Sequence, residues 1–560
     1  MDEPVPIITS LDALYPSESL VTQMQRWDRL YRHFASLYHS SSPQFVARSP
    51  GRVNILGEHI DYSLYEVLPM AILADVLIAV STSTPSPDSQ ETTILISNID
   101  SEKYPSTEFG IPSNGEIEID PSNHSWTNYF KAGCKGAVSL LRKQTPDLSL
   151  RSMSILVDGN VPAGSGLSSS AAFVCASALA VLRANGQSSV IKKQLVELAI
   201  VSERSVGVNS GGMDRTYISD SLIPFYALIH YWFAFLEQME ESRCRDLSQP
   251  SRKAFDRVML TPQNLESASV FSVRGDALSV SFSPELHAEA IAFPKLDPPI
   301  TFMIAQSFVV SDKHVTAPER YNLRVVECTL AADVLAAALK LKLEDDAAPL
   351  GRSLRGFQTA YYSPSPSSPG DPSTPYKTQL ETMLQLISTH LSNPSGYTHS
   401  DIASLLSISP TEVKSRYLTA FPVRASTFHL AHRATHVFSE ALRVLAFKSL
   451  LLTSPPPSGL LPQLGALMTE TQISCREAYD CSCAELDQLC EIAREAGTYG
   501  GRLTGAGWGG CTVHLVPKGK VEEVRKAWVE RYYKAREPGI SEERLREAIV
   551  VSEPGQGSAM

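Results

Sequence analysis

Apolar runs rich in branched side chains predict short strands at several separated points of the chain. They lie at 45–47, 67–80, 152–157, 511–516 and 548–551. Most of these runs adjoin glycine, proline or polar residues, as is typical of buried strands.

Helical patterns alternate with these runs. Small residues predict a helix over about 168–182, which ends before Asn185-Gly186, a common stop signal. A longer helix is predicted over 467–496 and a charged amphipathic one over about 521–535. Strand, helix and strand in succession at the C-terminal end indicate an α+β lobe rather than a helical bundle.

Two proline-rich segments read as surface insertions. Residues 363–375 mix five prolines with serines, and residues 455–462 contain three consecutive prolines. Proline lacks the backbone N–H that helices and strand ladders need, so neither segment is expected to form regular structure.

Length and charge narrow the class of protein. The 560 residues allow three or four folding units, or two large lobes, at ~150 residues per domain. Lys and Arg number 49 against 60 Asp and Glu, a net charge of −11. This balance argues against a nucleic-acid-binding protein, whose polyanionic partner requires a basic face.

Cysteine usage and hydropathy indicate an intracellular protein. The nine cysteines show no paired C-x-x-C spacing, and Cys481 and Cys483, in a stretch with a helical pattern, read as packing thiols rather than a metal site. The first residues are acidic, and no apolar run reaches the ~20 residues of a membrane span. We therefore expect a soluble, cytoplasmic protein.

The string P-A-G-S-G-L-S-S-S-A-A at 162–172 lies between a predicted strand and a predicted helix. Its glycines allow successive amide hydrogens to point at one anion, and the helix N-terminus adds partial positive charge. The string indicates a phosphate-binding loop, although no Lys follows as in the G-x-x-x-x-G-K-[ST] loop. A serine-capped turn is the simpler alternative.

Two further strings gather polar side chains. G-R-V-N-I-L-G-E-H-I-D-Y at 51–62 offers carboxylates and an imidazole for adjacent hydroxyl groups of a ligand, or else is a solvated charged turn. G-V-N-S-G-G-M-D at 207–214 ends on Asp214, which could orient a hydroxyl for attack on phosphorus. On its own, Asp after Gly-Gly is ordinary turn chemistry.

Together these strings resemble the motifs of the GHMP small-molecule kinases and, within them, the galactokinases. Residues 51–62 look like the galactokinase sugar signature and 162–172 like the superfamily's ATP loop. G-R-L-T-G-A-G-W-G-G-C-T at 501–512 looks like its third glycine motif, and Y-N-L-R-V-V-E at 321–327 is similar to the form in fungal galactokinases.

The resemblance implies an α+β, two-lobed fold with the active site in the cleft between the lobes. Residues 1–295 would form an N-terminal lobe like ribosomal protein S5, and residues 296–560 a ferredoxin-like C-terminal lobe. It also implies transfer of the ATP γ-phosphate to the anomeric hydroxyl of galactose, giving galactose 1-phosphate and ADP, with Mg²⁺ as a further cofactor.

Site residues are carried over from the matching positions. Asp214 would be the catalytic carboxylate and Arg52 its electrostatic partner. Ser170 and Glu203 would hold Mg²⁺. The sugar contacts would be Glu58, His59, Asp61 and Tyr321. ATP would be bound by Gly164, Ser165, Gly166, Leu167, Ser168, Ser169 and Ser170, with Trp126 and Tyr129 lining the adenine pocket unless they are ordinary core aromatics.

One block departs from the family pattern. Asp214 is followed by Arg215 where the family has Gln, and the family pattern resumes only at S-A-S-V-F-S-V, residues 267–273. We hypothesise that residues 216–266 are either a disordered excursion or sequence foreign to the working enzyme, such as an unspliced intron. This segment bears on the activity of the chain, because it adjoins Asp214 and small shifts beside a reacting centre cost about a hundredfold in rate.

Two rival functions stay open. The first is a galactose- and ATP-binding sensor that regulates transcription through a protein partner; the family's sensor form lacks a Ser-Ala pair of the ATP loop, whereas Ser170 and Ala171 are present here. The second is a kinase for another sugar, such as N-acetylgalactosamine. We expect no nucleic-acid or membrane partner.

Overall fold

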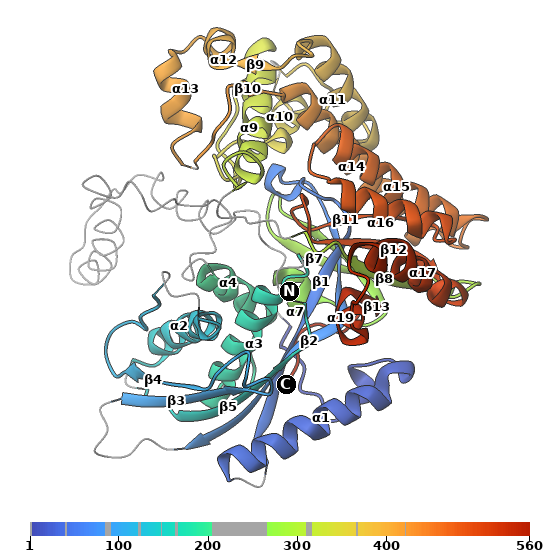
Figure 1. Ribbon diagram of the computed structural model, residues 1–560. Coiled ribbons are helices and arrows are strands. Elements are labelled where there is room, and N and C mark those ends of the chain that lie inside the picture. Colours follow the sequence, from blue (N-terminus) through green and yellow to red (C-terminus); the bar gives the residue numbers. More distant parts are fainter. Residues whose placement is uncertain are drawn as a thin grey trace, which may run out of the picture.

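The computed structural model describes residues 3–39, 42–83, 91–120, 125–146, 148–162, 166–203, 266–309, 316–365, 368–420 and 422–560. Within these residues the chain forms two main sheets, each covered by helices, and a further helical layer beyond them (Figure 1). Asp214 and the block 216–265 lie outside the described residues.

The first sheet has five strands in the order β1-β2-β5-β3-β4. All neighbours are antiparallel except β3 and β5, which run parallel. The predicted strands at 45–47, 67–80 and 152–157 are confirmed. The strands are β1 (Phe45–Leu56), β2 (Leu68–Ser83), β3 (Glu91–Asn98), β4 (Thr107–Pro112) and β5 (Ser152–Gly159).

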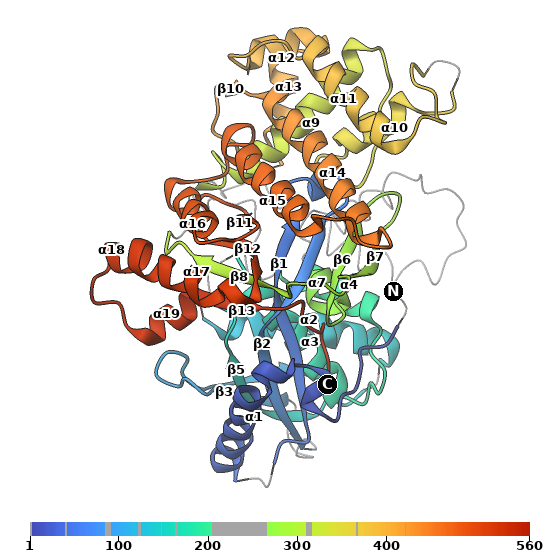
Figure 2. The ribbon, with the colours of Figure 1, turned by 90° about the vertical axis from the view of Figure 1, so that its right-hand side faces the viewer.

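Both faces of this sheet are buried over most of β1, β2 and β5, as their continuous apolar patterns predict. Val46, Leu77 and Leu156 pack against α1 (Ser17–Tyr38) on one face. The residues between them face the main core, where α3 (Ser169–Ala184) lies across β1 and β2. Figure 2 shows α1 on one side of the sheet, with α2 (Thr127–Gln144), α3 and α4 (Lys192–Glu203) on the other.

The second sheet has four antiparallel strands in the order β11-β12-β8-β13. Met303, Trp528 and Ile549 belong to a separate cluster between one face of this sheet and its helices. The strands are β8 (Ile300–Gln306), β11 (Gly500–Thr504), β12 (Cys511–Pro517) and β13 (Ile549–Ser552), and the covering helices are α16 (Ala484–Glu495), α17 (Val521–Trp528), α18 (Lys534–Arg536) and α19 (Glu542–Ala548).

Between the two sheets in sequence lie a short helix and a hairpin, and a group of helices extends beyond the second sheet (Figure 1). Two short strands, β9 and β10, join within that group. These elements are α7 (Glu266–Phe271), β6 (Asp276–Ser281), β7 (His287–Ala292), α9 (Tyr321–Ala338), α10 (Leu354–Tyr361), α11 (Tyr376–His390), β9 (Tyr397–Thr398), α12 (His399–Leu406), α13 (Pro410–Tyr417), β10 (Thr427–Phe428), α14 (Leu430–Leu452) and α15 (Leu460–Glu477).

The prediction of one helix over 467–496 is wrong. The chain forms α15 and α16 with a break at 478–483, where Asp480 takes a left-handed backbone conformation with φ +55°. The Cys481 N–H there donates to the Cys475 carbonyl at 2.9 Å. Cys481 and Cys483 therefore lie in a turn rather than in a helix.

Other predictions at the C-terminal end are confirmed. The helix at 521–535 forms as α17, a π-helical turn over Val529–Tyr533, and α18. The described part of 363–375 contains no helix or strand. In the second proline-rich segment, 455–462, the last residues are helical, because α15 begins at Leu460.

Within the described residues we find no helix whose length and hydropathy would suit a membrane span.

Candidate active site

Arg52 on β1 joins the strand that carries the predicted sugar signature to the predicted ATP loop. Its side chain is buried, and Nη1 donates to the Gly166 carbonyl at 2.7 Å. The backbone N–H of Arg52 also donates to the Leu167 carbonyl at 3.0 Å. Gly51, the residue before Arg52, must be small, because a Cβ there would lie 2.9 Å from the Leu167 carbonyl oxygen.

The end of β11 and the turn between β11 and β12, in the second sheet, contact both β1 and the predicted ATP loop. A Cβ on Gly505 would lie 3.2 Å from the Gly166 carbonyl oxygen. Thr504 Oγ1 accepts from the Asn54 N–H at 3.1 Å. Three strings far apart in sequence therefore meet in one place, and close backbone approach explains why they are rich in glycine.

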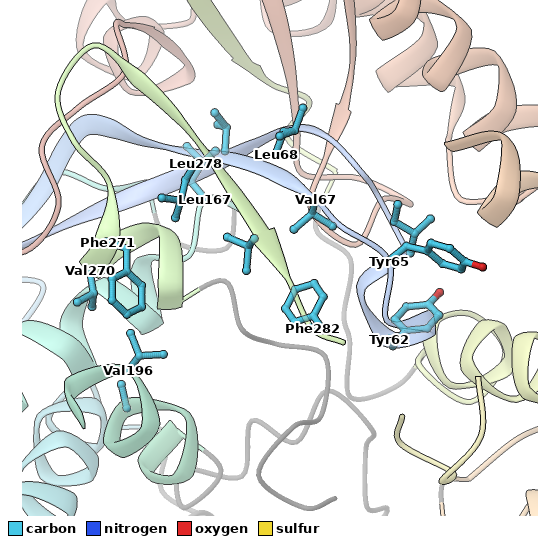
Figure 3. Packing of buried hydrophobic residues seen from close by; sticks show 14 of the residues in the cluster. Tyr62, Tyr65, Val67, Leu68, Leu167, Val196, Val270, Phe271, Leu278 and Phe282 are labelled. Atoms are coloured by element: carbon cyan, nitrogen blue, oxygen red, sulfur yellow. The ribbon is translucent and has the colours of Figure 1, made fainter. Parts of the chain in front are cut away.

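The chain turns sharply after β1. Gly57 has φ +100° and His59 has φ +61°, and a short 3₁₀-helix covers Asp61–Ser63. Figure 3 shows Tyr62 and Tyr65 on this turn, with Val67 and Leu68 leading into β2 beside Leu278 and Phe282. This apolar packing anchors the turn.

Glu58 and His59 are fixed by residues of the third glycine motif. The Glu58 carboxylate pairs with the guanidinium of Arg502 on β11, and both side chains are buried. His59 Nε2 lies 3.0 Å from the Ala506 carbonyl and Nδ1 lies 3.0 Å from the Tyr62 hydroxyl. Because a carbonyl can only accept, Nε2 carries a proton in this arrangement.

Arg502 places a second guanidinium near Arg52. Burial and the charge of Arg52 lower the pKa of Arg502 to about 9. The Glu58 carboxylate acts in the opposite direction, because an anion at hydrogen-bonding distance favours the charged guanidinium. We therefore assign Arg502 as charged at neutral pH, so that two guanidinium groups lie near the Glu58 carboxylate.

Asp61 and Tyr321 complete the predicted sugar contacts. Burial raises the pKa of the Asp61 carboxyl to about 6, although the residue keeps some exposed surface that a ligand can reach. Burial and then the charge of Asp61 raise the pKa of Tyr321, the first residue of α9. The Tyr321 ring centroid lies 5.8 Å from that of His59. The structure thus brings Glu58, His59, Asp61 and Tyr321 together.

The predicted ATP loop is described from Gly166 onward. Gly166 and Ser168 have φ +79° and +57°, and α3 begins at Ser169. Ser168, Ser169 and Ser170 are partly exposed, and the first turn of α3 contains no acidic residue. This helix N-terminus offers N–H donors and hydroxyls to an anion.

Trp126, at the start of α2, lies beside α3, while Tyr129 on α2 packs against the main core. The Trp126 ring stacks on Phe173 of α3, with centroids 6.0 Å apart and planes 8° apart. Both Trp126 and Tyr129 are half-buried. The position of Trp126 beside Phe173 fits either core packing or an adenine pocket.

Several predicted residues fall outside this geometry. Gly164, Ser165 and Asp214 lie outside the described residues. Glu203 is the last residue of α4, which packs beside α3, but its side chain is not among those described. No cluster of three His, Cys, Asp or Glu side chains suited to a metal occurs in the part of the chain that the structure describes.

The sequence did not single out several residues that hold the turn. Arg502 stands inside the third glycine motif, and its charge among glycines and apolar residues was the available signal. His436 and Glu440 on α14 are fully buried and contact the backbone of the turn. Their spacing puts two polar groups on one helix face, but nothing local connects that face with residue 57.

Comparisons with known proteins match the sequence ranges that contain these motifs. A model described as "Galactokinase galactose-binding signature" matches residues 32–82, and models of the GHMP kinases N-terminal and C-terminal domains match 128–219 and 453–535. A galactokinase of Lactococcus lactis solved with galactose shares the fold, with a TM-score of 0.58, 20% identity, and coverage of 95% of this chain and 99% of that one.

Fold and motifs therefore define a kinase of the GHMP class. Galactokinase of Saccharomyces cerevisiae is 39% identical over 95% of this chain and 94% of its own length, and galactokinase of Candida albicans is 36% identical over 98% and 97%. The chain belongs to the galactokinase family. The predicted α+β, two-lobed fold and the family resemblance are both confirmed.

Proposed function

We propose that this chain transfers the γ-phosphate of ATP to the anomeric hydroxyl of D-galactose, giving galactose 1-phosphate and ADP. The observation that carries the proposal is the bond from Arg52 Nη1 to the Gly166 carbonyl. It sets one guanidinium between the sugar signature and the phosphate loop, where a phosphoryl group in transfer would need its charge stabilised.

In this proposal Asp214 and Arg52 form the catalytic pair. Phosphoryl transfer passes through a loose transition state with little early proton abstraction. Asp214 would therefore orient the anomeric hydroxyl and take its proton late in the reaction. Arg52 would stabilise negative charge on the transferred group.

Glu58, His59, Asp61 and Tyr321 would bind the sugar. Carboxylates accept from hydroxyls, while the phenol both accepts and donates. The Glu58 carboxylate pairs with Arg502, and its remaining lone pairs can accept from a sugar hydroxyl. N-acetylgalactosamine is an alternative substrate that these contacts do not distinguish.

ATP would lie over the loop 164–170, with its phosphates at the N-terminus of α3 and its adenine near Trp126 and Tyr129. The donor set fits Mg²⁺, because the Ser170 hydroxyl and the Glu203 carboxylate are hard oxygen ligands on neighbouring helices. Bound Mg²⁺ would neutralise charge on the phosphates. Ser170 would orient it with its hydroxyl, and Glu203 would complete the cradle.

The remaining parts of the proposal concern organisation. We place the lobe boundary at 295/296, between the end of β7 and the start of β8. We place the enzyme in the cytoplasm. A transcriptional regulator as partner is the alternative that the sensor function would require.

Kinetics on the 560-residue chain with several hexoses and N-acetylgalactosamine test the function, with Asp214→Asn as the matched variant. We expect turnover with galactose and Mg·ATP. Asp214→Asn should leave galactose binding within about tenfold while kcat falls by about a thousandfold or more, since it removes only the reacting carboxylate. Galactose binding without turnover by the native chain would favour the sensor, and unchanged kcat in the variant would remove Asp214 from the mechanism.

A further inference from the structure

The backbone of the sugar-binding turn is held by one buried carboxylate from the second half of the chain. Glu440 Oε1 on α14 accepts from the N–H of Gly57 at 2.7 Å and from the N–H of Glu58 at 3.4 Å. Successive N–H groups of a bent backbone form a concavity that binds an anion. Here the protein's own carboxylate fills it.

The other carboxylate oxygen of Glu440, Oε2, is bound by side chains of α14 and α15. Oε2 accepts from Arg443 Nε at 2.7 Å and from Thr471 Oγ1 at 2.8 Å. Glu440 is fully buried, and a buried carboxylate is tolerated only when it is paired and hydrogen-bonded. Arg443 and Thr471 therefore hold the carboxylate in place, with its other oxygen aimed at the turn.

His436, one helical turn earlier on α14, holds the next peptide group. Its Nε2 lies 3.0 Å from the Glu58 carbonyl, and its Nδ1 lies 2.8 Å from Ser474 Oγ. The carbonyl can only accept, so Nε2 donates. Burial lowers the pKa of His436 to about 3, which keeps the ring uncharged at neutral pH.

We propose that Glu440 and His436 are positioning residues that set galactose affinity by fixing the backbone of Gly57 and Glu58. The inference rests on the proposed function, since it deepens the assignment of the sugar subsite. Neither residue belongs to a motif that matched the family. They act through the turn, because His59 has a left-handed φ and needs its neighbours to hold it there.

The expected consequence is selective. A relaxed turn displaces the side chains of Glu58, His59 and Asp61 together. The ATP loop is bound to β1 through Arg52 and Gly51 instead, so nucleotide binding should hardly change. Selective loss of sugar affinity separates a positioning role from general destabilisation.

The test uses the full chain with four substitutions. Glu440→Gln replaces the anion with a neutral amide. His436→Leu deletes the donor to the Glu58 carbonyl, whereas His436→Gln keeps an N–H donor there and should restore affinity. Val444→Ala, which removes buried apolar volume from the same helix without changing a polar group, is the control for lost stability.

Galactose and Mg·ATP dissociation constants are measured by calorimetry, with Tm and amide hydrogen exchange of the peptide spanning 56–63. Glu440→Gln and His436→Leu should weaken galactose binding by at least about tenfold, equal to about 1.4 kcal/mol. ATP binding should stay within about twofold, a difference below ~0.5 kcal/mol. Exchange at Gly57 and Glu58 should speed up in both variants but not in Val444→Ala.

The outcomes separate this inference from the proposed function. The positioning role is overturned if Glu440→Gln binds galactose with native affinity. It is also overturned if galactose binding and ATP binding weaken equally in all variants, including Val444→Ala. If Glu440→Gln does not fold, the comparison of His436→Leu with His436→Gln decides. A native chain that binds galactose without turnover refutes the kinase function only, and one that binds no galactose refutes both.

Discussion

Asp61 is partly buried, yet its proposed role in sugar binding requires an ionised carboxylate. Its surroundings raise its pKa to about 6, chiefly through burial, while the nearby His59 and Arg52 act in the opposite direction. A carboxylate accepts hydrogen bonds from sugar hydroxyls, whereas the protonated acid loses part of that capacity. The ionisation of one side chain therefore links pH to sugar affinity.

We expect galactose affinity to fall as the pH drops from 7.5 to 5. One pH unit below its pKa the carboxyl is only about one-tenth ionised, so the dissociation constant should rise about tenfold. Stability should change in the opposite direction. A carboxyl whose pKa is raised in the folded state binds its proton more tightly there, so the Asp61 contribution to the free energy of unfolding increases as the pH falls from about 6 to 3.8.

Calorimetric titration of galactose across this pH range checks the prediction, with Asp61→Asn as the control. The variant should bind galactose more weakly and without this pH dependence. An undiminished pH dependence in Asp61→Asn would assign the effect to another group, the neighbouring His59 being the first to examine.

At the scale of elements, the three glycine-rich strings act as packing surfaces for one another. Gly51 on β1 and Gly505 after β11 permit close backbone approaches that a Cβ would crowd, and Gly166 before α3 has a positive φ that favours glycine. At Gly51 the obstacle is partly the Leu167 carbonyl, which belongs to the backbone and cannot turn aside. The register between the sugar signature and the ATP loop thus depends on a missing methyl group.

Gly51→Ala should therefore lower both stability and ATP affinity. The new Cβ would lie 2.8 Å from Val161 Cγ1 and 2.9 Å from the Leu167 oxygen. Such overpacking costs about 1–3 kcal/mol. Moving Leu167 also shifts the Gly166 carbonyl that Arg52 binds, so the KM for ATP should rise and kcat should fall.

Gly159→Ala is the matched control, because a Cβ there meets only Val76 Cγ2 at 3.6 Å. Thermal unfolding and steady-state kinetics of both variants distinguish the cases. A Gly51→Ala protein with native Tm and native KM for ATP would show that this close approach does not set the loop.

Strands with a continuous apolar pattern were predictable, whereas a helix break and a long-range contact were not. The runs at 67–80 and 152–157 predict strands because they are continuous, apolar and rich in branched residues. The break at 478–483 was missed because Tyr479 and Cys481 continue the apolar pattern while Asp480 takes a conformation that periodicity does not reveal. The contact between Glu440 and Gly57 joins distant parts of the chain, which no local pattern encodes.

For the whole molecule, the last described residues return to the first sheet. Ala559 and Arg48 exchange backbone hydrogen bonds at 2.9 and 3.0 Å, and the Met560 carbonyl accepts from the Ile8 N–H at 2.7 Å. The tail thus lies between β1 and the N-terminal segment. Glycine, proline and serine dominate residues 553–558, so the sequence carries no apolar pattern that would predict this docking.

The side chain of Arg48 makes this docking important for stability. Its Nε pairs with Asp75 at 2.5 Å, and Nη1 donates to the carbonyls of Gln556 and Gly557 at 2.9 and 3.0 Å. Arg48 and Asp75 are both fully buried. The tail therefore satisfies a guanidinium that sits on the same strand as Arg52.

Removing residues 556–560 should destabilise the whole fold. It deprives a buried charged group of two acceptors, each worth about 1–3 kcal/mol, and we expect Tm to fall by about 2–5 °C in a chain of this length. Removing Met560 alone keeps both acceptors of Arg48, so thermal unfolding of that variant should show a much smaller drop. Kinetic constants at low temperature should stay near native in both, since neither deletion reaches the turn or the ATP loop. Equal Tm values for the two deletions would mean that the tail stabilises the fold through Met560 and the N-terminal segment instead of through Arg48.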